Sequence, residues 1–203
     1  MFWYIITICY SRFTVSEESH AMRNSKAVAP TFQDIIAFHG HSCPGLAIGF
    51  RMTTAALDFL SGTRAVDEEL VAIVENDACG VDALQYLAGC TFGKGNLVFR
   101  DYGKQVYTLY SRGSGRGVRV VFNEENLPGN ARENREHFID WLLAAPAAEI
   151  ILLQEVVIDE PEPARIKKSV YCAICREKVM ETRTREMNGK PACIPCFEKR
   201  HAR

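Results

Sequence analysis

Four cysteines near the C-terminal end of this sequence have the spacing of metal ligands. VYCAIC and PACIPC each contain a C-x2-C pair, and 17 residues separate the two pairs. Two such pairs at this separation are typical of a tetrahedral zinc site. Four thiolates leave no open coordination position, so the sequence predicts a structural zinc ion bound by Cys172, Cys175, Cys193 and Cys196. The alternative is a pair of redox-active C-x2-C motifs.

A second group of soft ligands lies in FHGHSCPG, where His39, His41 and Cys43 occupy alternate positions. Pro44 suits the first position of a helix, and the positive end of that helix would stabilise a Cys43 thiolate. Neutral imidazole and thiolate both bind zinc and similar transition metals. We therefore expect a metal site here. The alternative is that the histidines bond to the backbone and Cys43 fills apolar space.

The segment ENDACGVDALQ supplies the next reactive side chains. Cys79 falls in the first turn of a predicted helix, where the pKa of its thiol should be lowered. Asp82 and Gln85 follow near the same side of that helix, and Asp77 suits its N-cap. Cys79, Asp82 and Gln85 are therefore the candidates for catalytic roles if the chain is an enzyme.

These two segments are expected to share one metal ion, since both helix starts are electropositive and favour thiolates. His39 is either a ligand or a neighbour that orients one. The expected core site consists of His39, His41, Cys43 and Cys79. Further along the chain, Cys90 is read as structural, and GKGN is read as a turn in which Lys94 contacts an anion.

Helices and strands alternate around these segments. Apolar spacing, capping residues and turn residues predict helices over 31–40, 44–62, 77–89 and 133–145. Short β-rich runs predict strands over 69–76, 96–103, 105–112, 117–123 and 149–158. Five strands with four helices indicate an α+β domain.

Composition changes along the chain and predicts its domains. Residues 165–203 hold 11 Lys/Arg against four Asp/Glu, although the whole chain has a formal net charge of −1. The Pro- and Glu-rich DEPEPAR marks a linker. We expect a tail or a wrongly assigned start over 1–29, an α+β domain over 30–158, a linker over 159–169 and a zinc finger over 170–203. In the finger, Asn188-Gly189 suits a hairpin turn.

The cysteines and the N-terminal segment also bear on location. MFWYIITICY is too short to span a bilayer and has no basic segment before it. Cysteines placed beside His, Asp and Gly favour metal or thiol chemistry in a reducing cytoplasm over disulfides. The basic tail could contact nucleic acid, but it has few aromatic residues and no recognition-helix pattern, so nucleic acid is not the partner we expect.

FHGHSCPGLAIGFR, NDACGVDALQYLAGCTFGKGNL and DYGK together resemble the FmdE family, which takes its name from formylmethanofuran dehydrogenase. The resemblance covers residues 30–158. It implies a thioredoxin-like α+β core with a five-stranded mixed sheet, an intertwined homodimer and a metal pocket. The pocket roles fall on the four core residues named above, with Asp82 and Gln85 nearby. The tail resembles TraR/DksA zinc fingers, of zinc-ribbon or treble-clef type.

Only the name of the family suggests that this chain is an enzyme. No pterin site and no C-x2-C-x2-C iron–sulfur motif occurs in the sequence. We expect an accessory or regulatory metal-binding protein that works beside a redox enzyme such as a molybdenum or tungsten formylmethanofuran dehydrogenase. The first alternative is a stand-alone metal-dependent enzyme. Three protein ligands and a water on the body metal would support it. The second is a zinc-finger transcriptional regulator.

Overall fold

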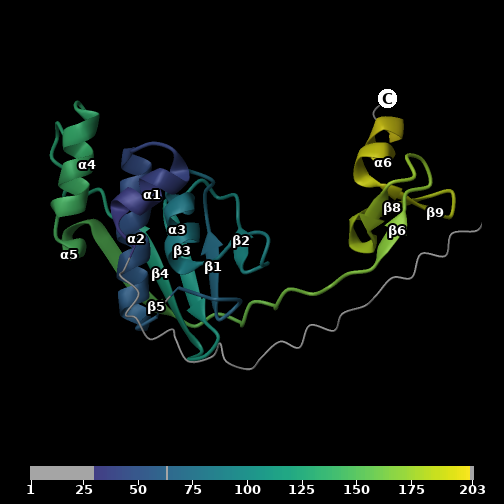
Figure 1. Cartoon of the computed structure of the whole chain (residues 1–203), viewed down its shortest axis with the longest axis horizontal. Coiled ribbons are helices and arrows are strands. Elements are labelled where there is room, and N and C mark those ends of the chain that lie inside the picture. Colours follow the sequence, from purple (N-terminus) through teal and green to yellow (C-terminus); the bar gives the residue numbers. More distant parts are fainter. Residues whose placement is uncertain (1–29, 63, 202–203) are drawn as a thin grey trace, which may run out of the picture. The chain divides into compact units, whose positions relative to one another are not determined.

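The computed structural model describes residues 30–62 and 64–201 (Figure 1). The expectations for residues 1–29 lie outside this range. Within the described residues, no helix has both the length and the apolar character needed to cross a bilayer. The first part of the described chain forms an α+β body, and the last part forms a small finger that is described separately below.

A five-stranded mixed sheet forms the centre of the body. Its strand order is β2-β1-β3-β4-β5, in which β1 and β2 are parallel and the other neighbours are antiparallel. The strands are β1 (Leu70–Val74), β2 (Leu97–Phe99), β3 (Val106–Ser111), β4 (Arg116–Phe122) and β5 (Ile151–Val156). All five residues of β1 are buried, as expected for a central strand. The expected α+β class and mixed sheet are confirmed.

Two helices that begin where the sequence predicts them frame the first soft-ligand segment. Helix α1 (Phe32–His39) starts with a capping box between Thr31 and Asp34 and ends at Gly40, which has a left-handed φ of 95°. Helix α2 (Pro44–Leu60) has proline in its first turn. Its N-cap is Cys43, whose sulfur accepts a hydrogen bond from the Leu46 N–H at 3.3 Å.

The third helix begins later than the sequence predicts. Helix α3 (Gly80–Ala88) has Cys79 at its N-cap position, with no side-chain capping hydrogen bond. The prediction of Asp77 as the cap was wrong, because the side-chain oxygen Oδ1 of Asn76 accepts the bond from the Ala78 N–H and shapes the turn before the helix. The Asp77 carboxylate is left exposed beside the soft ligands.

Glycines allow α2 and α3 to approach more closely than other residues would. A Cβ added at Gly49 would lie 2.2 Å from the Gly80 carbonyl oxygen, and one at Gly80 would lie 2.5 Å from the Tyr107 hydroxyl. Neither position tolerates a side chain without backbone movement. This contact brings the start of α3 against the first turns of α2, with a Cβ at Gly45 only 3.4 Å from the Cys79 Cβ.

The end of the body closes the core. Helix α4 (Arg135–Ala144) is capped by Asn134 and buries Phe138, Ile139 and Leu142. The short helix α5 (Ala147–Ile150) takes the first residues of the predicted last strand, so β5 begins at Ile151. The α2 residue Arg51 donates to the carbonyls of Leu143 and Ala145 and so ties the end of α4 to α2.

The finger has two hairpins and a helix instead of the one hairpin predicted. Strands β6 (Ser169–Tyr171) and β7 (Lys178–Met180) enclose the first C-x2-C pair, and the 3-10 helix η1 (Glu181–Arg183) follows. Strands β8 (Thr184–Met187) and β9 (Lys190–Cys193) turn at Asn188-Gly189, where both residues have positive φ as predicted. Helix α6 (Ile194–His201) carries Cys196 in its first turn.

The start of the predicted linker lies against the body. Arg112 donates to the Glu160 carboxylate and to the Pro161 carbonyl, each at 2.7 Å. Glu68 accepts from the Ala164 N–H at 3.0 Å. DEPEPAR is therefore anchored along most of its length, even though its composition is that of a linker.

Candidate metal centre

Four side chains from two segments of the chain converge in the body. The ligand atoms of His39, His41, Cys43 and Cys79 all lie within 4.8 Å of one another. The residue at the end of α1, the turn after it and the N-cap of α2 supply three of them, and the N-cap of α3 supplies the fourth. The structure thus brings together the four residues that the sequence suggested, including His39, whose role as a ligand had been left open.

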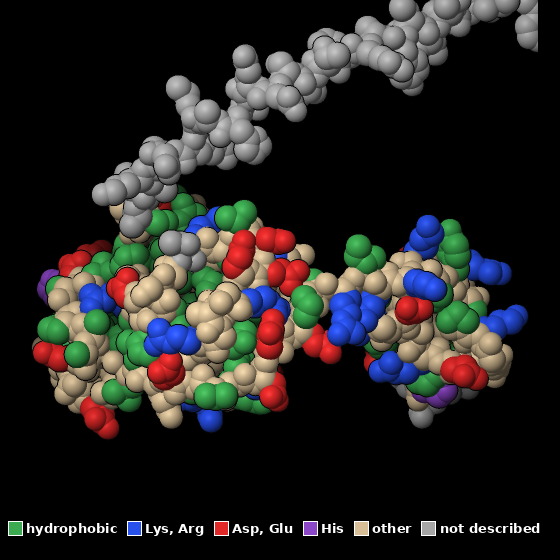
Figure 2. All heavy atoms as spheres, turned by 90° about the horizontal axis from the view of Figure 1, so that it is seen from below, with side chains coloured by type: hydrophobic (Ala, Val, Ile, Leu, Met, Phe, Trp, Pro, Cys, Tyr) green, Lys and Arg blue, Asp and Glu red, His purple; other side chains and the backbone are tan. Residues whose placement is uncertain are grey.

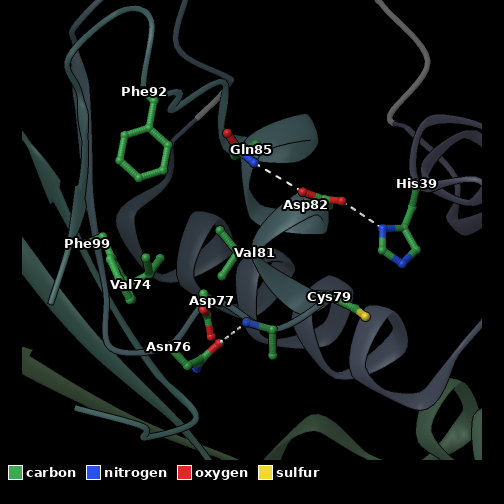
Figure 3. Close-up of a pocket in the computed structure, with 11 residues that line it drawn as sticks. His39, Val74, Asn76, Asp77, Cys79, Val81, Asp82, Gln85, Phe92 and Phe99 are labelled. Atoms are coloured by element: carbon green, nitrogen blue, oxygen red, sulfur yellow. Dashed lines mark hydrogen bonds and ion pairs between the residues drawn. The ribbon is translucent and has the colours of Figure 1, made fainter. Parts of the chain in front are cut away.

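A chain of hydrogen bonds orients His39 (Figure 3). Its Nδ1 lies 2.7 Å from Asp82 Oδ2, and Gln85 Nε2 donates to Asp82 Oδ1 at 3.2 Å. The His39 side chain is only 10% exposed, and its Nε2 is buried with no hydrogen-bond partner. A buried ring nitrogen without a partner is costly unless a ligand satisfies it. A carboxylate on the opposite nitrogen is the usual arrangement for a metal-binding histidine.

The loop that carries His41 is held from outside the motif. Arg135, in the first turn of α4, donates to the Ser42 carbonyl at 2.8 Å. The rings of His39 and His41 are tilted, with centroids 4.5 Å apart. His41 is exposed, whereas Cys43 is buried, so the four donors lie at an edge of the body that solvent reaches from the side of His41.

The thiol of Cys79 does not behave as the sequence predicted. Burial, together with a hydrogen bond to the Cys43 thiol, raises the pKa of Cys79 above its usual value. The expectation of a lowered pKa was wrong, since the turn before α3 is partly buried and the neighbouring thiol outweighs the helix start. Without a metal, Cys79 is therefore a poor thiolate nucleophile at neutral pH. A divalent ion would remove this penalty, because it binds the deprotonated sulfur.

The cysteines of the finger form the second cluster of potential ligands. The sulfurs of Cys172, Cys175, Cys193 and Cys196 lie within 4.8 Å of one another. Hydrogen bonds from the backbone N–H groups of Cys193, Cys175 and Ile174 lower the pKa of Cys172 to about 6. Such N–H···S bonds stabilise a thiolate, so the geometry of the finger fits a four-thiolate zinc site.

Both donor sets fit a soft or borderline transition metal. Two imidazoles with two thiolates, and four thiolates, are the common tetrahedral sets for zinc. The body ion would be held by the four core residues and oriented by Asp82. It would supply charge that keeps both thiols deprotonated. Four converging protein donors suit a site of structural or sensing type more than one with a vacant position.

A cavity of about 330 Å³ lies beside the core cluster (Figure 3). His39 and Cys79 belong to its wall, together with Asp82 and Gln85, the remaining candidates for catalytic roles. Figure 3 shows the rings of Phe92 and Phe99 on the side away from His39 and Cys79. Sequence reasoning missed both rings: Phe92 lies within the segment NDACGVDALQYLAGCTFGKGNL and Phe99 within a predicted strand, but neither was assigned a role in a site.

Two further predictions are settled by local contacts. Cys90 is fully buried and its thiol donates to the Leu70 carbonyl at 3.5 Å; burial raises its pKa to about 12, in keeping with a structural role. The contacts of Lys94 are with backbone carbonyls. Its ammonium lies 3.3 Å from each of the carbonyl oxygens of Ala65, Val66 and Asp67, so it closes the loop before β1.

Comparison with known proteins gives two family matches. The model described as "FmdE, Molybdenum formylmethanofuran dehydrogenase operon" matches residues 38–158. The prokaryotic dksA/traR C4-type zinc finger matches residues 167–201.

Two individual proteins are also similar. A protein of Archaeoglobus fulgidus named "Probable S-adenosyl-L-methionine-binding protein" is 40% identical over 187 residues, which cover 78% of this chain and 50% of that protein. The chain thus spans about half the length of this relative. The crystal structure of a tungsten formylmethanofuran dehydrogenase FmdE-like protein from Syntrophus aciditrophicus matches with a TM-score of 0.67 and 26% identity. That match covers 88% of this chain and 98% of the other.

Proposed function

This chain belongs to the FmdE family, and from that premise we propose that it is an accessory or regulatory protein that binds two metal ions, one in the body and one in the finger. The observation that carries the proposal is the convergence of four soft donors at each of two places. The finger ion is zinc and structural. The body ion is zinc or a similar transition metal, bound by His39, His41, Cys43 and Cys79.

The donor count supports an accessory role over catalysis at the body metal. A catalytic zinc usually keeps one position for water or substrate, whereas four protein donors fill a tetrahedron. The raised pKa of Cys79 also argues against a free reactive thiolate at this place. Asp82 and Gln85, which were candidates for catalysis, have the geometry of residues that orient His39.

The proposed context is redox metabolism in a reducing compartment. The name of the Syntrophus protein supports a redox-enzyme partner of the formylmethanofuran dehydrogenase type. Among the described residues, seven cysteines are free and none is paired in a disulfide, which supports a cytoplasmic location. We include a homodimer in the proposal because the family resemblance implies one.

Metal content of the full chain tests the proposal. We expect about two ions per chain after purification under anaerobic, metal-replete conditions. His41→Ala or Cys79→Ala should each leave one, and combining either with Cys193→Ser should leave none. His137→Ala and Cys90→Ala are the matched controls, since neither residue belongs to a cluster, and both should keep two. A wild-type chain with one ion, all of it lost in Cys193→Ser, would overturn the body site.

Transcriptional regulation is a second candidate function, favoured by the finger. The finger matches a dksA/traR family model, and its visible surface in Figure 2 carries many Lys and Arg side chains. DNA binding that weakens steeply as salt rises from 50 to about 200 mM would support this function. Absence of binding at the lowest salt would exclude it.

S-adenosylmethionine is a candidate ligand through the name of the Archaeoglobus relative. Because this chain spans half of that protein, the ligand stays a proposal. Calorimetric titration of the metal-replete full chain with S-adenosylmethionine tests it directly. Heat that saturates at one equivalent per chain is the expected result if this half of the relative carries its binding site.

A further inference from the structure

The cavity beside the core cluster has two different ends (Figure 3). One end is formed by His39 and Cys79, which are two of the four proposed metal ligands. The other end carries Phe92, on the loop before β2, and Phe99, the last residue of β2. A ligand in this space would therefore touch the metal centre on one side and aromatic rings on the other.

The aromatic end is exposed in a way that a folded core does not explain. Phe92 is 67% exposed and Phe99 is 39% exposed, yet both line a concave space rather than a flat surface. Val74 of β1 and Val81 of α3 add apolar side chains to the wall of the cavity. The volume of about 330 Å³ is at the small end of the range for small-molecule sites, roughly 300–1,000 Å³.

Charge selects among the ligands that could fit. Asp77 and Asp82 line the cavity, and no Lys or Arg is among its lining residues. A divalent ion bound by two thiolates is formally neutral, so the metal centre would not cancel these carboxylates. Carboxylates and phosphates are thereby disfavoured as ligands, and a positive group is favoured.

Aromatic faces together with carboxylates are the chemistry that recognises organic cations. An ammonium or sulfonium that carries methyl groups is attracted to ring faces and needs no hydrogen-bond donors around it. Its methyl groups suit Val74 and Val81, and its charge suits Asp77, which is free of the capping role predicted from the sequence.

From these contacts we propose that the cavity binds a small methylated organic cation, an ammonium or a sulfonium, next to the body metal. The inference deepens the proposed function by naming the class of ligand that the accessory protein senses. It rests on the proposed function only in assuming that the body metal is bound. The cation needs no open coordination position, so it is compatible with four protein ligands. Because His39 and Cys79 line the cavity and also belong to the proposed metal site, binding of the cation and binding of the metal are coupled.

A pair of isosteric probes separates charge from shape. Choline and trimethylsulfonium are titrated into the metal-replete full chain and followed by ligand-observed NMR, with 3,3-dimethylbutan-1-ol as the neutral isostere of choline. We expect at least one cation to bind about fivefold more tightly than the neutral alcohol. Which cation binds better distinguishes an ammonium ligand from a sulfonium ligand. If neither cation binds more tightly than the neutral alcohol, or if neither cation binds at all, the proposal is overturned.

Two variants locate the binding, and each has a control outside the cavity. Phe92→Leu keeps apolar volume without the ring, and Asp77→Asn removes one charge; each should weaken cation binding at least about threefold. Tyr102→Leu and Asp101→Asn change an exposed ring and an exposed carboxylate that do not line the cavity, and should leave binding unchanged. Equal losses in variants and controls would also overturn the proposal.

Metal content is measured on the same samples, so the two proposals fail separately. A chain that carries the body metal but prefers no cation contradicts only the cavity assignment. A chain without the body metal contradicts the proposed function, while the preference for cations over the alcohol still decides the cavity.

Discussion

At the scale of single residues, the body site depends on a side chain that is not among its proposed metal ligands. Asp82 holds His39 by Nδ1 and is itself held by Gln85, so the imidazole presents Nε2 inward. A carboxylate in this position fixes the tautomer of the ring and strengthens it as a ligand.

Asp82→Asn should therefore weaken binding of the body metal about 10- to 100-fold, because the amide is a poorer acceptor for the Nδ1–H. Competition with a chromophoric chelator measures the affinity. Asp77→Asn is the matched control, since it removes a nearby charge that has no bond to His39, and its affinity should stay within about threefold of wild type. A similar loss of metal affinity in both variants would mean that the negative charge of the carboxylates, rather than the hydrogen bond to His39, strengthens metal binding.

Cys90 offers a second residue-scale prediction. Burial raises the pKa of its thiol to about 12, so at pH 8 only about one molecule in 10⁴ carries the thiolate. In folded protein, iodoacetamide should leave Cys90 unlabelled after other thiols have reacted, and peptide mapping by mass spectrometry reads this out. Unfolding in guanidinium should expose it. Rapid labelling of Cys90 in the folded chain would contradict the structural role.

Residue types and close spacing were enough to predict the four finger cysteines and the group of His39, His41 and Cys43, whereas Cys79 was assigned to the core site from its place at a helix start and from the family resemblance. They could not predict the state of each group. The pKa of Cys79 depends on the Cys43 thiol, which is close in space but far along the chain. The contacts of the Lys94 ammonium are with three carbonyl oxygens of the loop before β1. Phe92 belongs to no periodic pattern, and only the fold places it beside the cluster.

At the scale of elements, the contact between α2 and α3 sets the distance between the two core thiols. Caps and glycine stops in the sequence predicted α1 and α2 well. The start of α3 was misplaced because Asp77 suits a cap by residue type, whereas the Asn76 side chain accepts the bond from the Ala78 N–H and the helix begins only at Gly80. The glycine contact itself was not predicted, since glycine in a helix usually only weakens it.

Gly49→Ala tests this contact. Alanine favours a helix by about 1 kcal/mol over glycine, but its Cβ would lie 2.2 Å from the backbone oxygen of Gly80, which cannot rotate away. Overpacking of this kind costs about 1–3 kcal/mol, so we expect a net loss of stability and a lower metal content. Thermal unfolding and mass spectrometry measure the two effects.

Gly62→Ala is the control for this experiment, because its Cβ would meet only ordinary contacts at 3.7 Å or more. Its melting temperature should stay within about 2 °C of wild type. If Gly49→Ala melts as the control does and keeps its metal, the close approach of α2 and α3 is not what positions Cys43 and Cys79.

At the scale of the whole molecule, the chain joins an acidic body to a basic finger through a segment that is anchored rather than loose. Composition predicted the domain boundary at DEPEPAR, where an acidic part of the chain gives way to a basic one. It could not predict that Arg112 and Glu68 would bind Glu160, Pro161 and Ala164, because these contacts join residues about 50 to 100 positions apart.

Cys193→Ser should remove the finger zinc and open the finger to protease, since so small a module depends on its metal for folding, by about 10 kcal/mol. Trypsin should then cut at Arg165, Lys167 and Lys168 and leave a resistant body, because the segment before them is held by Arg112 and Glu68. Gel analysis and intact mass of the fragment check this. Cleavage within the body at the same rate would show that the body depends on the finger ion. Full zinc retention together with resistance to protease would show that the four-cysteine assignment is wrong.

The proximity of Cys43 and Cys79 has a consequence for the topology of the chain. A metal ion bound by both closes the segment from residue 43 to residue 79 into a ring, which includes all of α2 and β1. In the chain-entropy model, closing a ring of this size lowers the entropy of the unfolded chain by an amount worth about 4 kcal/mol. The ion is then a reversible cross-link, which serves in a reducing compartment where a disulfide would not persist.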